Sequence, residues 1–312
     1  MANIAFVGLG VMGAPMAGHL ARAGHRVRGW ARRPGVADAW AAAVQGGSAT
    51  AAAGGSATAA ATLEGALDGA EALVTCVGAD ADLRALLLGD GEGAPLVGGA
   101  LDALPPGALV IDHTTASPGV ARDLAAACAG RGLHWLDAPV SGGQAGAEAG
   151  RLSVMAGGTP EAFEAAGPFL AAYAARSVRI GPAGHGQLAK LVNQIAIAGL
   201  VEALAEALAF GRAAGLDMDA VLAAVGAGAA QSWQMDNRAA SMLEGRFDFG
   251  FAVEWMRKDL GLALAEARAL GASLPVAALV DQFYAEVEAM GGGRWDTSSL
   301  IARLPRGRGC DR

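Results

Sequence analysis

The chain has 312 residues, of which 53% are hydrophobic and 17% are charged, and its formal net charge is −7. This composition excludes an intrinsically disordered chain, and the length is typical of a protein with about two domains. The acidic balance argues against a nucleic-acid partner, because phosphate binding needs a basic surface.

Residues with metal or redox chemistry are scattered. The three cysteines are far apart and odd in number, which predicts a reducing compartment without a disulfide framework, and the five histidines lack metal-ligand spacing. The chain starts without the basic and apolar regions of a signal peptide. Its most apolar stretch, after Lys190, is interrupted by Glu202 and Glu206. We therefore expect a soluble cytoplasmic protein with no metal and no membrane partner.

Short apolar runs alternate with alanine-rich stretches in the first half of the chain. The stretches have apolar residues at three- and four-residue spacing, as in amphipathic helices. This βαβ order is typical of a parallel sheet covered by helices on both faces. Residues 46–58 contain GGSAT twice, and we expect a surface loop there. The runs predict strands at residues 4–8, 25–30, 72–77, 108–113, 133–138, 151–158 and 176–181.

From about residue 186 the strand patterns stop. Residues 186–215 form one long helical pattern, and the rest is helical almost to the end. A short polar tail after Pro305 is expected to be disordered. We therefore predict an α/β protein with two domains. A Rossmann-type, doubly wound parallel sheet covers residues 1–182, a long helix joins the domains, and an all-α domain covers residues 183–312.

The stretch GLGVMG at residues 8–13 fits the pattern G-x-G-x-x-G. It directly follows a predicted strand and opens a helix that ends near Gly24. In this context the first glycine permits a tight turn, the second lets the backbone approach a pyrophosphate, and the third lets helix and strand pack closely. The alternative is a simple glycine-rich turn. The residues expected to bind a dinucleotide are Gly8, Leu9, Gly10, Val11, Met12 and Gly13.

The second predicted strand, at residues 25–30, bears on the choice between NAD and NADP. An NAD site usually ends this strand with an acid for the ribose 2′-hydroxyl. Here Arg32 and Arg33 follow the strand, and no acid occurs until Asp38. Two guanidinium groups suit a 2′-phosphate. We expect NADP(H), with NAD(H) possible, and the alternative for the arginines is a solvated surface pair.

The stretch DAPVSGG at residues 137–143 ends another predicted strand with a serine and two glycines. Gly142 and Gly143 can adopt backbone conformations closed to other residues and turn their N–H groups toward a ligand. Ser141 adds a hydroxyl donor. Together they would form a cradle of the size of a carboxylate, although the residues alone leave a plain glycine loop equally open.

The helix that starts near residue 186 carries one cation, Lys190, and no other charge before Glu202. Asn193 and Gln194 follow three and four residues later and share its face. Desolvation on an apolar helix would favour the neutral amine and let Lys190 exchange protons near neutrality. The alternative is a lysine whose amine reaches water at a domain edge.

Three motifs occur in the order and at the spacing of a known family: GLGVMGAPMA, DAPVSGGQAGAEAGRLSVMAGG and GHGQLAKLVNQ. With them the chain resembles the β-hydroxyacid dehydrogenase family, which includes 3-hydroxyisobutyrate dehydrogenase and tartronate semialdehyde reductase, over essentially its whole length. The resemblance implies an oxidoreductase that transfers a hydride between NADP(H) and a small β-hydroxyacid or its semialdehyde.

The resemblance also implies roles for single residues. It implies Lys190 as the general acid and base, Ser141, Gly142 and Gly143 at the substrate carboxylate, and Asn193 with Gln194 beside the substrate.

On the cofactor side, the resemblance implies contacts from Val77 and Thr115, and from Lys258, which could instead pair with Asp259. It also implies that Trp233 lies in a segment where substrate specificity varies, although a tryptophan there could simply belong to the core.

Two other functions stay open from the sequence. Imine reductases share the fold, but another residue usually replaces the lysine there. A catalytically silent homologue acting as a binding module would have lost Lys190, which this chain keeps. The long apolar helices of the second half predict a homodimer or homotetramer.

Overall fold

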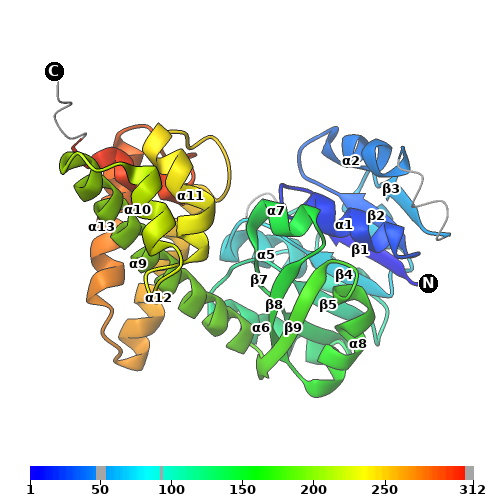
Figure 1. Cartoon of the computed structure of the whole chain (residues 1–312). Helices are drawn as coiled ribbons and strands as arrows, with labels where there is room; N and C mark the ends of the chain where they lie inside the picture. Colours follow the sequence, from blue (N-terminus) through cyan, green and yellow to red (C-terminus); the bar gives the residue numbers. More distant parts are fainter. Residues whose placement is uncertain (47–53, 92–93, 306–312) are drawn as a thin grey trace. The chain divides into compact units, whose positions relative to one another are not determined.

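The computed structural model describes residues 1–46, 54–91 and 94–305 (Figure 1). The chain divides into two compact units, Met1–Lys190 and Leu191–Arg312. The division falls inside one helix, α9 (His185–Ala213), whereas the sequence pattern places a domain boundary at residues 182 and 183. The expected disordered tail and the first GGSAT copy after Gly46 lie outside the described residues.

The centre of the first unit is a sheet, which has nine strands within the described residues. Its strand order is β3-β2-β1-β4-β5-β6-β8-β7, with β9 paired to β8, and the first six strands are parallel. The order reverses between β1 and β4, as in doubly wound nucleotide-binding sheets. This confirms the predicted Rossmann-type fold. The strands are β1 (Asn3–Val7), β2 (Arg26–Trp30), β3 (Ser56–Ala59), β4 (Ala72–Thr75), β5 (Leu109–Asp112), β6 (His134–Asp137), β7 (Val140–Ser141), β8 (Leu152–Gly158) and β9 (Ala174–Gly181).

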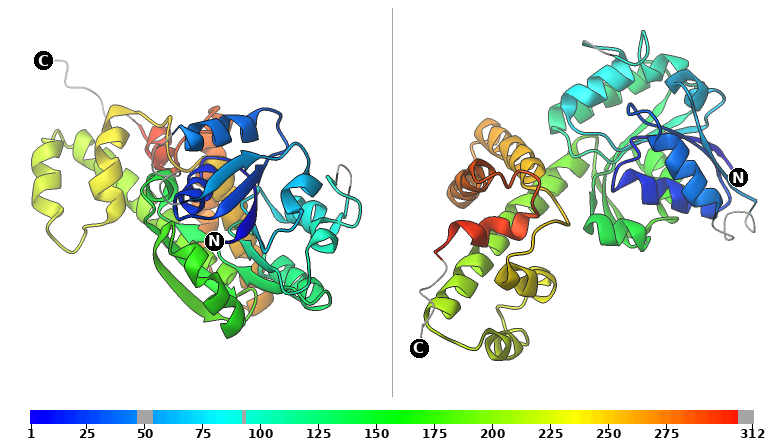
Figure 2. Two further views of the ribbon diagram at one scale, coloured as in Figure 1. Left: turned by 90° about the vertical axis from the view of Figure 1, so that its right-hand side faces the viewer. Right: turned by 90° about the horizontal axis from the view of Figure 1, so that it is seen from above.

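Helices cover both faces of this sheet (Figure 2). Strand β1 shows why, because its alternate side chains enter two different cores. Ile4 and Phe6 pack with residues of α1 (Gly13–Arg22), α2 (Val36–Gln45), α7 (Gly143–Glu148) and α8 (Pro160–Leu170). Ala5 and Val7 pack with residues of α4 (Leu63–Leu67), α5 (Asp80–Leu88), η1 (Ala100–Ala103) and α6 (Pro118–Ala129).

The sheet differs from the sequence prediction in three places. β8 runs antiparallel to β6, because the connection between them holds only the short β7 and α7 and cannot form a full crossover. β7 itself, with two residues, was not predicted. The second GGSAT copy is not a plain loop, since Ser56–Ala59 forms β3 and pairs with β2.

The second unit is helical, as predicted. Within the described residues, its core combines one side of α9 with side chains of α12 and α13. Ala198, Val201, Ala205 and Leu208 recur on α9 at helical spacing and are buried. Its elements after α9 are α10 (Met218–Val225), α11 (Trp233–Glu244), α12 (Val253–Leu270), α13 (Pro275–Ala289) and η2 (Thr297–Arg303).

Helix α9 is long and apolar enough to cross a membrane, with 29 residues and a mean hydropathy of 1.5 in its most apolar window. This is weak evidence for a span, because core helices of folded proteins have the same length and composition. Glu202 lies buried on α9 and forms an ion pair with Arg303 of η2. These contacts support a core helix of a folded unit.

A buried histidine ties the sheet to the end of α8. His113 follows β5 directly, and its Nδ1–H donates to the Ala138 carbonyl at 2.6 Å while its Nε2 accepts from the Tyr173 hydroxyl at 2.8 Å. Burial lowers the pKa of His113 to about 4, more than its hydrogen bond to Ala138 raises it. The ring is therefore neutral in the folded protein.

This histidine predicts an acid-sensitive contribution to stability. Its folded pKa of about 4 lies below the ordinary 6.5, so the unfolded chain binds the proton first as the pH falls. We expect the unfolding free energy of the natural protein to fall between pH 6.5 and pH 4 relative to that of a His113→Gln variant. Urea unfolding of both proteins across this range measures the difference, and a pH-independent difference would contradict the assignment.

Candidate active site

The loop between β1 and α1 is shaped by two close backbone contacts. At Gly8, with φ +99°, a Cβ would lie 2.1 Å from the Cys76 carbonyl oxygen, and at Gly13 it would lie 1.8 Å from the Gly8 carbonyl oxygen. At Gly10 a Cβ would meet nothing within 4 Å. Packing therefore requires Gly8 and Gly13 to be glycines, whereas Gly10 keeps a bare backbone toward open space.

At the N-terminus of α1, this loop offers backbone groups to a ligand. Leu9 is buried in the core and Val11 is exposed. Among the residues that the structure describes, no side chain caps the N-terminus of α1 at Met12. Uncapped N–H groups at a helix N-terminus suit an anion such as a pyrophosphate. The loop thus has the donors and the open space that a dinucleotide needs.

The two arginines after β2 are exposed. Arg32 has 70% of its side chain exposed and forms an ion pair with Asp82 of α5 at 2.8 Å. An exposed ion pair of this kind contributes little to the free energy of folding. A phosphate group could therefore replace the carboxylate with only a small loss of stability. Arg33 is also exposed and follows directly.

A buried hydrogen-bond network fixes the loops that follow β4 and β5. The Val77 N–H donates to the Thr114 hydroxyl at 3.0 Å, and the Thr114 N–H donates to Asp112 Oδ1 at 3.1 Å. The same Asp112 oxygen accepts from the Thr75 hydroxyl at 2.7 Å. The network holds together the loops that carry Val77 and Thr115, at the carboxyl ends of adjacent parallel strands.

The serine–glycine segment forms a tight turn between β7 and α7. Ser141 is half-buried and pairs with Ser153 of β8. Gly142 and Gly143 have φ values of +128° and +60°, which strain any other residue. Both glycines are exposed. The segment therefore places a serine directly beside two exposed glycines with bare backbone, which are the residue types that a small carboxylate needs.

One histidine connects this segment to the glycine loop. His19 Nε2, on α1, lies 3.1 Å from the Ala147 carbonyl oxygen and 3.0 Å from the Glu148 carbonyl oxygen, both at the end of α7. An Nε2–H there donates to the last two carbonyls of α7, of which the Ala147 carbonyl also accepts from the Gly150 N–H at 3.2 Å. Helices α1 and α7 thus support each other.

Lys190 lies in the second turn of α9 and is buried, with 8% of its surface exposed. The chain has only two lysines, Lys190 and Lys258. The sequence singled out both, but it did not single out two residues that hold the start of α9. These are Gln187 and Asp137, both fully buried.

Asp137, at the end of β6, binds the first turn of α9. Its Oδ1 accepts from the Gly184 N–H at 2.8 Å and its Oδ2 from the Gln187 N–H at 3.1 Å. Burial raises the pKa of Asp137 to about 7, although these two hydrogen bonds lower it. The sequence shows only an acid at the end of a predicted strand. It does not show what this acid binds, because its two partners lie 47 and 50 positions away.

The remaining candidate residues belong to the second unit, where they form one polar chain. The Asn193 amide donates to Gln194 Oε1 at 2.8 Å, and the Gln194 amide donates to Asp259 Oδ2 at 2.6 Å. Lys258 Nζ lies 3.2 Å from Asp259 Oδ1. The salt bridge that the sequence offered as an alternative for Lys258 is therefore present.

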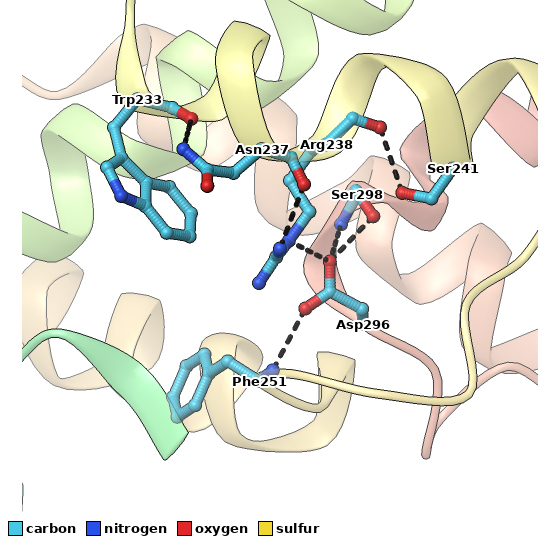
Figure 3. A network of polar contacts seen from close by, with 7 residues as sticks. All are labelled: Trp233, Asn237, Arg238, Ser241, Phe251, Asp296 and Ser298. Carbon is cyan, nitrogen blue, oxygen red and sulfur yellow. Dashed lines mark hydrogen bonds and ion pairs between the residues drawn. The ribbon is translucent and has the colours of Figure 1, made fainter. Parts of the chain in front are cut away.

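Trp233 opens α11 and is 54% exposed, so the suggestion that it belongs to the core is wrong. Its carbonyl accepts from the Asn237 amide at 2.9 Å. The Arg238 guanidinium carbon lies 4.9 Å from the centroid of its ring (Figure 3). The sequence could not decide between a buried and an exposed tryptophan, because a cation over one face of the indole can stabilise the ring at the surface.

Arg238 is held from the other side by a buried acid (Figure 3). Its Nε lies 3.3 Å from Asp296 Oδ1, and that oxygen also accepts from the Ser298 N–H at 3.0 Å and its hydroxyl at 2.6 Å. Asp296 Oδ2 accepts from the Phe251 N–H at 2.9 Å. The ion pair thus fixes the guanidinium on which the Trp233 ring rests.

Comparison with known proteins identifies the family. Residues 3–181 match the model of the NAD binding domain of 6-phosphogluconate dehydrogenase. Residues 184–304 match the model described as NAD-binding of NADP-dependent 3-hydroxyisobutyrate dehydrogenase. The chain is also 36% identical to 3-hydroxyisobutyrate dehydrogenase of Pseudomonas aeruginosa, over 99% of this chain and 100% of that protein. The chain belongs to the β-hydroxyacid dehydrogenase family.

Two further proteins are similar to this chain over nearly its whole length. An uncharacterized oxidoreductase of Shewanella frigidimarina is 51% identical over 99% of this chain and 100% of its own length. The structure of Mycobacterium tuberculosis 3-hydroxyisobutyrate dehydrogenase with L-serine is similar with a TM-score of 0.80 and 31% identity, over 97% of this chain and 100% of that chain. The predicted family and the predicted NAD(P)-dependent oxidoreductase activity toward β-hydroxyacids are thereby confirmed.

The glycine loop gives a prediction that separates packing from binding. Gly13→Ala forces a methyl group against a backbone carbonyl, so we expect a loss of about 1–3 kcal/mol of stability or more. Gly10→Ala has room, so we expect an unchanged melting temperature and weaker dinucleotide binding. Thermal unfolding and fluorescence titration with NADPH measure the two effects.

Gly167→Ala on α8 is the matched control, because a Cβ there also meets nothing within 4 Å. It should leave NADPH binding unchanged, and it should raise the melting temperature slightly because alanine is favoured over glycine inside a helix. If Gly10→Ala bound NADPH as tightly as the control, the loop would not contact the cofactor.

Proposed function

We propose that the protein is an NADP(H)-dependent dehydrogenase or reductase of a small β-hydroxyacid or its semialdehyde, with Lys190 as general acid and base. The observation that carries this proposal is the burial of Lys190 on a helix whose first turn is hydrogen-bonded to the carboxyl-end loops of the sheet. Ligands of doubly wound sheets bind at that edge.

The residues present fit a dinucleotide. In our proposal the backbone of residues 8–13 holds the pyrophosphate at the N-terminus of α1, and Arg32 and Arg33 bind the 2′-phosphate. Val77 and Thr115 contact the nicotinamide half, and Lys258 contributes from the second unit. When bound, the cofactor supplies or accepts the hydride.

The substrate carboxylate is assigned to the serine–glycine segment. The Ser141 hydroxyl and the N–H groups of Gly142 and Gly143 can donate to one anion, because the positive φ values leave these amides on an exposed turn. A carboxylate fixed in this way limits how the rest of a three- or four-carbon substrate can lie.

Lys190 acts on the reacting oxygen. In reduction its ammonium group donates a hydrogen bond to the substrate carbonyl, polarises it and transfers a proton to the oxygen. In oxidation the neutral amine accepts the proton of the substrate hydroxyl. Asn193 orients the substrate or the lysine, and Gln194 holds the Asn193 amide through the hydrogen bond between their side chains.

The alternatives have less support. Imine reductases usually carry another residue in place of the lysine, and a silent binding module would not need to keep Lys190. The substrate within the class is to be found by assay. L-Serine belongs in the panel because it has a carboxylate and a β-hydroxyl, like 3-hydroxyisobutyrate, and tartronate semialdehyde belongs there as a reducible member.

The second unit is proposed as the substrate and oligomerisation domain, and the protein as a homodimer or homotetramer. Large apolar side chains of α9 are exposed, including Val192, Leu200 and Phe210, and such surfaces are typical of protein interfaces. The sedimentation coefficient reports the oligomeric state. We further propose that the protein is cytoplasmic and acts on a small carboxylate, with no nucleic-acid or membrane partner.

The central experiment replaces Lys190. With NADPH absorbance as the readout and a panel of small acids and semialdehydes, we expect Lys190→Ala to lower kcat by about 10²- to 10⁴-fold, the usual range for a general acid or base. The dissociation constant for NADPH should stay nearly unchanged. Lys190→Arg is the matched control, because it keeps the charge but cannot act as a neutral base.

Two results would contradict the proposal. Normal turnover by Lys190→Ala would exclude the lysine as proton donor. A natural protein that turns over no member of the panel with NADPH or NADH would favour the binding-module function.

The cofactor preference has its own test. Arg32→Ala and Arg33→Ala should each raise the KM for NADPH by about tenfold to a hundredfold, because a charge-assisted hydrogen bond to the 2′-phosphate is lost. The KM for NADH should change little. Arg131→Ala is the matched control, since Arg131 also pairs with a surface acid, Asp102. Equal effects on both cofactors would exclude a 2′-phosphate contact.

A further inference from the structure

The start of α9 is attached to the loop after β5 by one side chain. The Gln187 amide Nε2 donates to the Thr114 carbonyl at 2.8 Å, and its Oε1 accepts from the Ala116 N–H at 3.0 Å. The side chain therefore binds the residue before and the residue after Thr115. Gln187 is fully buried and lies three positions before Lys190 on the same helix.

The first turn of α9 has little freedom to move away from this attachment. Asp137 accepts one N–H group from this turn and one from the residue just before it. A Cβ at Gly186 would lie 2.5 Å from the carbonyl oxygens of both Asp137 and Met155, and one at Gly157 would lie 2.7 Å from the Asp137 carboxylate oxygens. The helix therefore packs directly on the backbones of β6 and β8.

The amide of a glutamine matches the two groups that it binds. A carbonyl needs a donor and an N–H needs an acceptor, and a side-chain amide supplies both. Neither an ionised carboxylate nor an apolar side chain can satisfy the two groups together, and a buried polar group without a partner is unfavourable. The side chain thus connects Lys190 to the Thr115 segment by two bonds whose directions are fixed.

We propose that Gln187 is a positioning residue, which sets the Lys190 amine relative to the Thr115 segment by clamping the backbone on both sides of Thr115. This rests on the proposed function, in which Lys190 transfers the proton and Thr115 contacts the nicotinamide half of the cofactor. A small displacement of a proton donor lowers the rate far more than it lowers binding.

The test compares two glutamine-to-methionine variants. Gln187→Met keeps the side-chain length and removes both bonds. Gln45→Met is the control for the same change of side chain, because Gln45, although exposed, also donates from a helix to a backbone carbonyl, that of Ala57 at 2.6 Å, between α2 and β3. Assays are run below the melting temperatures of all variants.

For Gln187→Met we expect kcat to fall by about 10- to 100-fold, with the dissociation constant for NADPH changed by no more than about twofold. In the ligand-free protein, the Ala116 amide should exchange its hydrogen faster. The Gln45→Met control should lose stability only, with kcat and the dissociation constant for NADPH unchanged. Should Gln187→Met fail to fold, Gln187→Glu keeps the acceptor for Ala116 and loses the donor for Thr114, and the same separation of kcat from binding is expected.

The outcomes separate this proposal from the proposed function. Faster exchange at Ala116 with unchanged kcat would overturn the positioning role, and so would an equal loss of kcat in the Gln45→Met control. The Lys190→Ala variant in the same assay tests the proposed function by itself. If Lys190→Ala is inactive and Gln187→Met is fully active, the proposal that Lys190 donates the proton is supported and the positioning role of Gln187 is excluded.

Discussion

The buried carboxylate of Asp137 is the contact on which the arrangement of the first unit depends. It ends a central strand and accepts one N–H group from the residue just before α9 and one from the first turn of α9, where a helix has donors without internal partners. Bare glycines on both sides let strand and helix backbones meet around it. As a result, the helix that carries Lys190 starts at the edge of the sheet where the glycine loop and the Thr115 segment also lie.

The fold was largely predictable, because a parallel sheet buried on both faces leaves apolar runs that are readable in one sequence. The elements that escaped prediction lack that signal. β3 is Ser56–Ala59, where two alanines have low strand preference, and it pairs in parallel with β2. The reversal at β8 depends on the length of a connection, which local patterns do not encode.

Candidate residues that lie in sequence motifs could be named from the sequence. Residues that act through hydrogen bonds between distant segments could not. Glycines 8, 10 and 13, the serine–glycine turn and Lys190 stand out in the sequence. Gln187 does not, because its partners lie 71 and 73 positions earlier in the chain. The second unit shows the same limit: Asn193 and Gln194 follow Lys190 closely, but the contact of Gln194 with Asp259 spans 65 positions.

The division of the chain directly after Lys190 has a consequence for how such enzymes can diversify. Under the proposed mechanism, the anion-binding turn, the clamp and the proton donor all belong to one compact unit. Trp233, Arg238 and the other polar side chains of the following helices belong to the second. A chain that takes the segment beyond position 190 from a relative therefore exchanges these side chains together with Asn193, Gln194 and Lys258, while it keeps the glycine loop, the serine–glycine turn and Lys190.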